Sequence, residues 1–287
     1  MPTRSSPTVK RRRLAAELRK AREAAGLTIE DVAEKLEWSS AKISRIENAH
    51  VGVLPRDVKF LLSTYGHSDS DELWDVLLTL ARESRQKGWW HQYGDAIPDW
   101  FQVYVGLEAE AATINCYRAE FMHGLLQTRD YARAVHRASL PSARDEEIEQ
   151  LVEVRMARQE LLTSDDAPQL WLILNEAVLR RVVGGCAAMH AQLERLSDAT
   201  GLPSVTVQVI PFSSGAHASM DGSFTILGFS DDIDPQTVYL EYQSGSIYLE
   251  KREEVSRYRL IFDHLRAAAL PVEASRTLIR RCAEELA

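Results

Sequence analysis

The run Ser39–Glu47 carries residue types that could contact the bases of DNA. Arginine is the side chain that most often donates paired hydrogen bonds to guanine, so Arg45 is the main candidate for a sequence-specific contact. The spacing of Ile43 and Ile46 predicts a short helix with an inward apolar side, which leaves its first turn and its opposite side open to a partner. The candidates for contact with base edges at these positions are Ser40, Ala41, Ser44 and Arg45.

Further polar residues near this helix are candidates for contact with DNA phosphates. Residues 1–13 are rich in arginine and poor in apolar residues, which predicts a disordered basic arm that binds phosphates or enters a minor groove. A tail that only keeps the protein in solution is the alternative. Lys42 lies on the flank of the expected helix, and Asn48 lies at its end. The phosphate candidates are Lys42, Asn48, Thr28, Arg11, Arg12 and Arg13.

The flanking residues have the pattern of the helices that would position these side chains. Thr28 is followed three residues later by Asp31, as in a capping box at the start of a helix. Two helices joined by a short turn over 37–39 are typical of a helix-turn-helix, whose second helix enters the major groove. A generic helical bundle is the alternative. We expect five helices, over 10–25, 28–36, 39–48, 53–65 and 68–82, the last with Leu73, Val76, Leu77 and Leu80 on its apolar face.

The N-terminal segment resembles the lambda-repressor-like (XRE-type) helix-turn-helix family. The resemblance implies a buried ion pair between Arg22 and Glu47 that joins the first and third helices. The family commonly has glutamine at the first position of the second helix, where this chain has Ile29, so the phosphate contact made there is lost or moved. The residues that carry the resemblance are Leu18-Arg19, Arg22, Gly26-Leu27-Thr28, Val32-Ala33, Leu36 and Ser44-Arg45-Ile46-Glu47-Asn48.

Charge is distributed unevenly along the 287 residues. Residues 1–60 contain 13 Lys and Arg against 8 Asp and Glu, whereas residues 61–287 contain 21 against 34, and the net charge is −8. A basic segment on an acidic body is expected of a small DNA-binding head on a body that avoids phosphates. No apolar run approaches the length of a membrane helix, and three distant cysteines indicate a reducing compartment. We therefore expect a cytoplasmic, nucleoid-associated protein.

An aromatic-rich segment follows the expected helices. Six Trp, Tyr and Phe side chains fall within residues 89–104, and rings of that size are rarely left in water. We interpret the segment as a docked linker, with a dimer contact or the wall of a ligand pocket as alternatives. The chain then divides into a DNA-binding domain over 1–84, a connector over 85–104, and a regulatory and dimerisation domain over 105–287.

The N-terminal domain is thus expected to be all-α, whereas helical and strand patterns alternate from residue 105 onward. This alternation predicts an α+β domain with a mostly antiparallel sheet of five or six strands. The expected strands are 113–121, 169–174, 205–210, 222–229, 237–242 and 247–250, the last two joined by a hairpin turn over 243–246.

The second segment resembles DUF5753, a domain of unknown function of the Scr1 and WhiJ type that follows XRE-type heads in many actinomycete regulators. The resemblance implies a small partner protein of the DUF397 type. Met122-His123 stands where the family often has Val-Pro, so we expect a different loop there. The residues that carry the resemblance are Gly124-Leu125-Leu126-Gln127-Thr128, Tyr131-Ala132, Asn175-Glu176-Ala177-Val178-Leu179-Arg180, Gln192-Leu193, Val209-Ile210-Pro211-Phe212, Gly215-Ala216-His217, Gly222-Ser223-Phe224 and Val238-Tyr239-Leu240-Glu241.

Three carboxylates at expected strand ends, Glu120, Glu176 and Glu241, could form a shared acidic pocket for a cationic ligand or for the partner protein. A metal site, and separate acids that are each paired with an arginine or capped by a helix N-terminus, are the alternatives. His217 lies in a loop, where it could gate a pocket or simply be satisfied by its neighbours. The sequence has no nucleophile elbow, Walker loop or clustered metal ligands, so we expect no metal, no cofactor and no enzymatic activity.

These features predict a sequence-specific transcriptional regulator. We expect a repressor that binds palindromic or paired half-sites of double-stranded DNA as a homodimer. Its C-terminal domain would receive a signal from the small partner protein. An antitoxin-like protein that neutralises its partner and regulates its own operon, and a regulator that senses a small molecule, are the alternatives.

Overall fold

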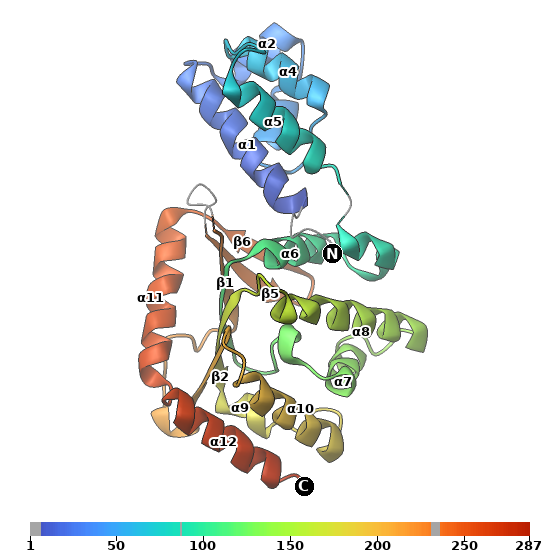
Figure 1. Ribbon diagram of the computed structural model, residues 1–287, viewed down its shortest axis with the longest axis vertical. Helices are drawn as coiled ribbons and strands as arrows, with labels where there is room; N and C mark the ends of the chain where they lie inside the picture. The colour runs from blue at the N-terminus through green and yellow to red at the C-terminus, as the bar shows by residue number, and fades with distance from the viewer. Residues whose placement is uncertain (1–6, 87, 231–235) are drawn as a thin grey trace. The chain divides into compact units, whose positions relative to one another are not determined.

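The computed structural model describes residues 7–86, 88–230 and 236–287 (Figure 1). The chain divides into two compact units, residues 1–91 and 92–287, and each is described here by itself. The first unit is all-α, and the second contains a six-stranded mixed sheet with helices on both sides. The predicted fold class is therefore confirmed.

Five helices surround one apolar core in the first unit. They are α1 (Pro7–Ala24), α2 (Ile29–Leu36), α3 (Ser40–Glu47), α4 (Pro55–Thr64) and α5 (Glu72–Glu83). Each contributes a stripe of apolar residues to the interior, as the spacing predicts. The fully or almost fully buried side chains of this core include Leu14, Leu18, Val32, Ile43, Val58, Leu61, Leu62, Leu77 and Leu78.

Helix α1 begins earlier than the sequence suggests. Residues 7–9 are already helical, and Thr8 and Val9 are buried, so the apolar side of α1 extends to its first turn. The prediction of a disordered arm over 1–13 is therefore wrong for residues 7–13, because burial of this first turn stabilises the helix there. The remainder of the predicted arm, residues 1–6, lies outside the described residues.

Helix α5 differs from the prediction in its start and in its buried side. It begins at Glu72 rather than near residue 68. Val76 is 43 % exposed, whereas Leu77, Leu78 and Ala81 are buried. The helix is thus rotated relative to the predicted apolar stripe, because packing against α1 and α4 selects the side that carries Leu78 and Ala81.

The sheet of the second unit has the strand order β3-β2-β1-β4-β5-β6. β1 pairs in parallel with β2, and β2 pairs in parallel with β3, whereas β4, β5 and β6 continue from β1 as antiparallel neighbours. The strands are β1 (Thr113–Arg118), β2 (Gln169–Asn175), β3 (Val205–Ile210), β4 (Phe224–Gly228), β5 (Thr237–Tyr242) and β6 (Gly245–Leu249).

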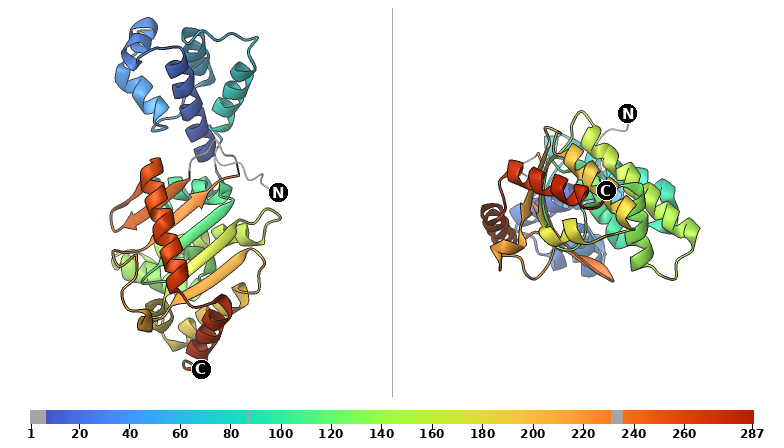
Figure 2. Two further views of the ribbon diagram at one scale, coloured as in Figure 1. Left: turned by 90° about the vertical axis from the view of Figure 1, so that its left-hand side faces the viewer. Right: turned by 90° about the horizontal axis from the view of Figure 1, so that it is seen from below.

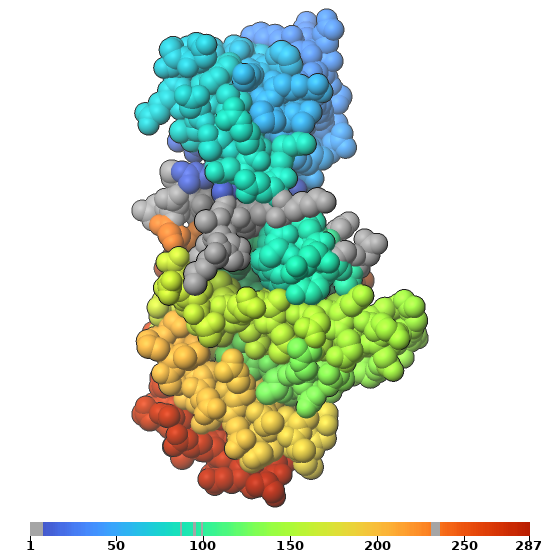
Figure 3. All heavy atoms as spheres, turned by 45° about the vertical axis from the view of Figure 1, so that its right-hand side comes forward, coloured from blue at the N-terminus to red at the C-terminus, as the bar shows by residue number. Residues whose placement is uncertain are grey.

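Helices cover both faces of this sheet (Figures 1 and 2). On one face, Phe262 and Leu265 of the long helix α11 pack against Tyr117, Phe224 and Ile173 of the strands. On the other face lie α6, α7, α8 and α10, whose surfaces come forward in Figure 3. The helices of this unit are α6 (Asp99–Glu110), α7 (Arg129–Ser139), α8 (Asp145–Gln159), α9 (Glu176–Arg180), α10 (Cys186–Ala199), α11 (Arg252–Ala268) and α12 (Val272–Glu284), with short 3-10 turns η2 (Gly124–Leu126), η3 (Glu160–Thr163) and η4 (Phe212–Ser214). The 3-10 segment η1 (Trp89–Ala96) contains the residues at which the two units divide.

Two local predictions for this unit are corrected by the structure. The hairpin turn contains two residues rather than four, because Tyr242 already pairs with Gly245. Helix α6 runs across residue 105, where we expected the connector to end. Its Tyr104 ring lies 4.2 Å from the ring of Tyr239 in β5, centroid to centroid, so this part of the aromatic segment packs on the sheet.

Candidate nucleic-acid interface

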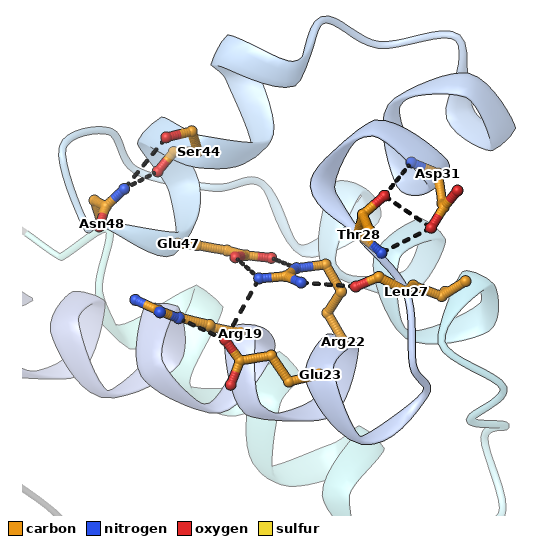
Figure 4. A network of polar contacts seen from close by, with 9 residues as sticks. All are labelled: Arg19, Arg22, Glu23, Leu27, Thr28, Asp31, Ser44, Glu47 and Asn48. Atoms are coloured by element: carbon orange, nitrogen blue, oxygen red, sulfur yellow. Dashed lines mark hydrogen bonds and ion pairs between the residues drawn. The ribbon is translucent and has the colours of Figure 1, made fainter.

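A buried ion pair fixes the third helix of the first unit (Figure 4). Arg22 of α1 donates from Nε and Nη2 to the two carboxylate oxygens of Glu47 in α3, at 2.8 and 2.9 Å. It also donates from Nη1 to the carbonyl oxygen of Leu27, at 2.7 Å. The side chains of Arg22 and Glu47 are 9 % and 3 % exposed. This is the pairing that the family resemblance implied, and it joins α3 both to α1 and to the loop before α2.

Side-chain caps define where α2 and α3 begin. The Thr28 hydroxyl accepts from Asp31 N, and Thr28 N donates to the Asp31 carboxylate, which completes a capping box at α2. The Ser39 hydroxyl accepts from Lys42 N at the start of α3. Between the helices, Glu37 adopts a left-handed backbone conformation with φ of 55°. These local hydrogen bonds produce the short turn that a helix-turn-helix requires.

The predicted base-contact residues lie on one side of α3. Ala41 and Arg45 are exposed, and Ser40 and Ser44 are half-buried. Ile43 and Ile46 point into the core from the opposite side. Arg45 Nε donates to the carbonyl oxygen of Ala41 at 3.3 Å, which holds the guanidinium beside the first turn of the helix. In a helix-turn-helix, that turn is the part of the recognition helix that reaches base edges.

Three of the predicted phosphate contacts are already engaged within the unit. Lys42 Nζ lies 3.2 Å from Asp57 Oδ2 and 3.3 Å from the centre of the Trp38 ring. Asn48 Nδ2 donates to the carbonyl and hydroxyl oxygens of Ser44, at 2.8 and 3.3 Å (Figure 4). The Thr28 hydroxyl donates to Asp31. A phosphate at these positions would therefore have to share or replace an existing partner.

The structure does not place the basic run Arg11–Arg13 on a free arm. These side chains are half-buried on α1, and burial lowers the pKa of Arg11. At about 1.5 Å of rise per residue, Arg12 lies about 15 Å along α1 from Arg22, the residue that contacts α3. Ile29, at the first position of α2, packs partly buried against the core. It cannot supply the polar contact that glutamine makes there in the resembled family.

The four candidates of the second unit have separate partners. Glu120 lies 2.6 Å from Arg181, and both are exposed. Glu241 accepts a hydrogen bond from Tyr239 at 3.1 Å. His217 Nε2 lies 3.1 Å from the Tyr117 hydroxyl. Glu120 thus follows the alternative of separate acids paired with an arginine, whereas Glu241 is also separate but is partnered by a tyrosine.

Glu176 is the one of these four candidates that lines a described pocket, of about 310 Å³, which Arg281 also lines. Its carboxylate accepts from Arg180 at 2.9 Å and from Phe212 N at 2.8 Å. Both of its oxygens therefore have partners within the fold. Among the described residues, no three His, Cys, Asp or Glu side chains gather in a way that could hold a metal ion.

Sequence reasoning missed a buried charged group beneath α8. Arg158 donates from Nε and Nη2 to the two oxygens of Glu108 in α6, each at 2.8 Å, and both side chains are almost fully buried. Two further arginines, Arg118 of β1 and Arg155 of α8, lie in the same interior. No local signal marks them, since an arginine on an amphipathic helix usually faces solvent.

The capped α2, the turn and the braced α3 define a helix-turn-helix protein, and the chain is a DNA-binding regulator of that class. Residues 13–73 match a helix-turn-helix domain family, and residues 101–281 match a domain of unknown function, DUF5753. The second match covers more than half of the chain, which therefore belongs to the DUF5753 family, as the sequence resemblance indicated.

Comparison with curated proteins and with solved structures finds no match to the chain. Within the described ranges, no helix combines the length and the apolar character needed to cross a membrane.

Proposed function

We propose that the protein is a sequence-specific transcriptional repressor whose α3 reads bases in the major groove. The observation that carries this proposal is the exposed side of α3, where Arg45 extends beside small residues on a helix braced from within by Arg22. Few side chains on this side are long enough to reach a base edge, so Arg45 supplies most of the direct readout. Sequence-dependent DNA shape supplies the remainder.

In vitro selection of DNA sites with the full chain tests this proposal. Arg45→Ala is expected to relax the preference at one position of the site and to weaken binding by about 1–3 kcal/mol. Arg82→Ala is the matched control, because Arg82 is an exposed arginine of the same unit on α5. Unchanged preference in Arg45→Ala would overturn the assignment of base readout to this residue.

The protein is proposed to act as a homodimer, because two helix-turn-helix units on one DNA face bind half-sites one turn apart, about 34 Å. The selected sites would then be palindromic or paired with that spacing. Sedimentation of the full chain with and without a selected site measures the number of chains bound per site. One chain on a single, unpaired half-site would contradict the dimer.

The second unit is proposed to receive a signal from a small protein of the DUF397 type, a role supported by membership in the DUF5753 family. Genome-wide mapping of bound sites, with and without the neighbouring gene for such a protein, tests this role. A rise in the level of transcripts near the bound sites when the regulator is deleted would support repression. The antitoxin-like alternative requires the partner to be toxic alone, and a harmless partner excludes it.

This role requires no catalysis, and we propose that the protein is not an enzyme and acts at the nucleoid in the cytoplasm. The support for this location is that DNA binding by the helix-turn-helix unit would hold the working protein on chromosomal DNA. Fluorescence imaging of the tagged full chain should show it co-localised with DNA. An even distribution through the cell that does not change on Arg45→Ala would argue against this location.

A further inference from the structure

Three arginines lie together on the α6 and α8 side of the sheet, and we call them the arginine cluster. Arg118 comes from β1, and Arg155 and Arg158 come from successive turns of α8. Cys116, two residues before Arg118, pairs with Thr225 of β4, to whose hydroxyl Arg118 Nη2 donates at 3.0 Å. The cluster therefore lies between the middle of the sheet and α8.

The buried charges of this cluster do not balance. Arg158 is neutralised by Glu108 through two hydrogen bonds of 2.8 Å. The partners of Arg155, in contrast, are neutral: Nη1 donates to Gln127 Oε1 at 2.7 Å, and Nη2 lies 3.2 Å from His136 Nε2. The three guanidinium groups thus outnumber the two carboxylates that act on them, Glu108 and the exposed Glu241, and the excess positive charge is unfavourable unless an anion compensates it.

Three unsatisfied polar atoms around the cluster carry a proton that they can donate. Arg118, His123 and Tyr104 are 9 %, 1 % and 2 % exposed. Within the described part of the chain, Arg118 Nε, His123 Nε2 and the Tyr104 hydroxyl have no hydrogen-bond partner. His123 Nδ1 accepts from Leu125 N, so the neutral imidazole carries its proton on Nε2. A buried donor without an acceptor is costly, and three in one region indicate a missing acceptor.

The electrostatic effect of the cluster on nearby groups agrees with this geometry. Burial, followed by the charges of Arg118, Arg158 and Arg155, holds the pKa of His123 well below its ordinary value. Burial and the neighbouring Arg158 lower the pKa of Arg155 to about 10. The positive charge of all three arginines therefore acts on the same interior region.

The backbone of the loop that follows β1 approaches Arg155 closely at Gly124. A side-chain carbon at Gly124 would lie 3.2 Å from Arg155 Cδ and 3.3 Å from Arg155 Nη1. Gln159 of α8 donates to the carbonyl oxygens of Gly124 and Gln127, at 3.0 and 2.7 Å. The loop is thus tied to the same turns of α8 that carry Arg155 and Arg158.

We propose that the arginine cluster is a binding site for the oxyanion group of a small molecule, a carboxylate or a phosphate. Such a group has acceptors only, so it satisfies Arg118 Nε, His123 Nε2 and the Tyr104 hydroxyl while it neutralises the excess positive charge. A cation is repelled by the arginines, and a neutral ligand leaves the charge uncompensated. The site is independent of DNA recognition by α3.

Thermal unfolding of the full chain tests the site with two probes, inorganic phosphate and succinate, each against chloride at equal ionic strength. We expect one of the two anions to raise the unfolding temperature, and the rise to level off as the anion concentration increases. The anion that has this effect identifies the chemistry of the ligand. Arg118→Gln is expected to weaken the apparent affinity about tenfold or more. Arg129→Gln is the control, because Arg129 is an exposed arginine of α7 paired with Glu153.

Arg118→Lys keeps a positive charge and provides a second variant if Arg118→Gln does not fold. The Nε–H resonance of Arg118, assigned by its loss in Arg118→Lys, is expected to shift on titration with the effective anion. An equal response of the wild-type chain and both Arg118 variants would show binding elsewhere and overturn the proposal. Absence of a saturable response to either anion would also overturn it. The response to the anion does not depend on DNA binding, so it should be unchanged in Arg45→Ala even if that variant no longer binds DNA.

Discussion

Lys42 Nζ lies 3.2 Å from Asp57 Oδ2, and this contact ties the first turn of α3 to the first turn of α4. The ammonium group also lies over the Trp38 ring. The residue that we expected to bind a phosphate therefore serves within the fold to hold the recognition helix. In the DNA complex, phosphate and Asp57 would compete for the same cation.

Asp57→Asn should remove this competition and leave Lys42 available to a DNA phosphate. We expect non-specific DNA affinity to rise and the slope of log K against log salt to steepen by about one unit, because one more cation reaches a phosphate. Fluorescence anisotropy over a salt series measures both quantities. Asp75→Asn on α5 removes the same charge elsewhere in the unit, and an equal rise in that control would mean that net charge alone is responsible.

Arg22→Ala should destabilise the first unit by about 3–5 kcal/mol, because it leaves the Glu47 carboxylate buried without a partner. Amide hydrogen exchange in α3 measures the loss where the contact is made. Arg19→Ala breaks the exposed pair with Glu23 one turn away and should change stability by about 0.5 kcal/mol or less. Similar losses of stability in the two variants would show that burial of the Arg22 and Glu47 pair adds nothing to the stability of the first unit.

Thr28→Ala should cost about 1 kcal/mol of stability in the first unit, since the hydroxyl caps α2 and its loss leaves Asp31 N unpaired. Chemical unfolding followed by circular dichroism measures the change. Thr64→Ala removes a hydroxyl that bonds only back to Phe60 within α4 and serves as the control. If both substitutions have the same effect, the capping box does not set the start of α2.

Acid should destabilise the second unit through His136. Burial, together with Arg155 and Arg158, lowers the pKa of His136 to about 3, against about 6.5 in the unfolded chain. Between these values the unfolded state binds the extra proton, so stability falls as pH falls, by up to about 1.4 kcal/mol per pH unit.

His136→Gln keeps an acceptor for Arg155 and removes one of the two histidines beside the arginine cluster whose pKa burial lowers. The slope of unfolding free energy against pH should therefore fall by up to about 1.4 kcal/mol per pH unit between pH 6.5 and 4, while His123 keeps its contribution. Urea unfolding at a series of pH values measures this slope. His264→Gln, at an exposed position of α11, is the control and should keep the slope of the wild-type chain. An unchanged slope in His136→Gln would assign the acid sensitivity to another group.

Elements fixed by local hydrogen bonds were predictable from the sequence. Thr28 and Ser39 cap the helices that follow them, and their partners lie three residues away. The strands 205–210 and 237–242 are also found where the alternating patterns placed them. In these cases, the residues that decide the structure are neighbours in the chain.

Features that depend on distant contacts were not predictable. The aromatic run before residue 105 looked like a linker because the partner of Tyr104, Tyr239, lies in a strand far along the chain. The pair of Arg158 and Glu108 was missed because the two residues are fifty positions apart in the chain. Val76 looked buried because helical spacing alone does not distinguish it from Leu78.

The strand order has a consequence for the newly made chain. β1 is the first strand synthesised and lies in the interior of the sheet, but its neighbours β2 and β4 begin only at residues 169 and 224. At about 5–20 residues per second, β1 waits for seconds, whereas a small helical unit folds in microseconds to milliseconds. The DNA-binding head is therefore complete while both edges of β1 are unpaired, and this interval is when the nascent protein is most exposed to strand-mediated aggregation.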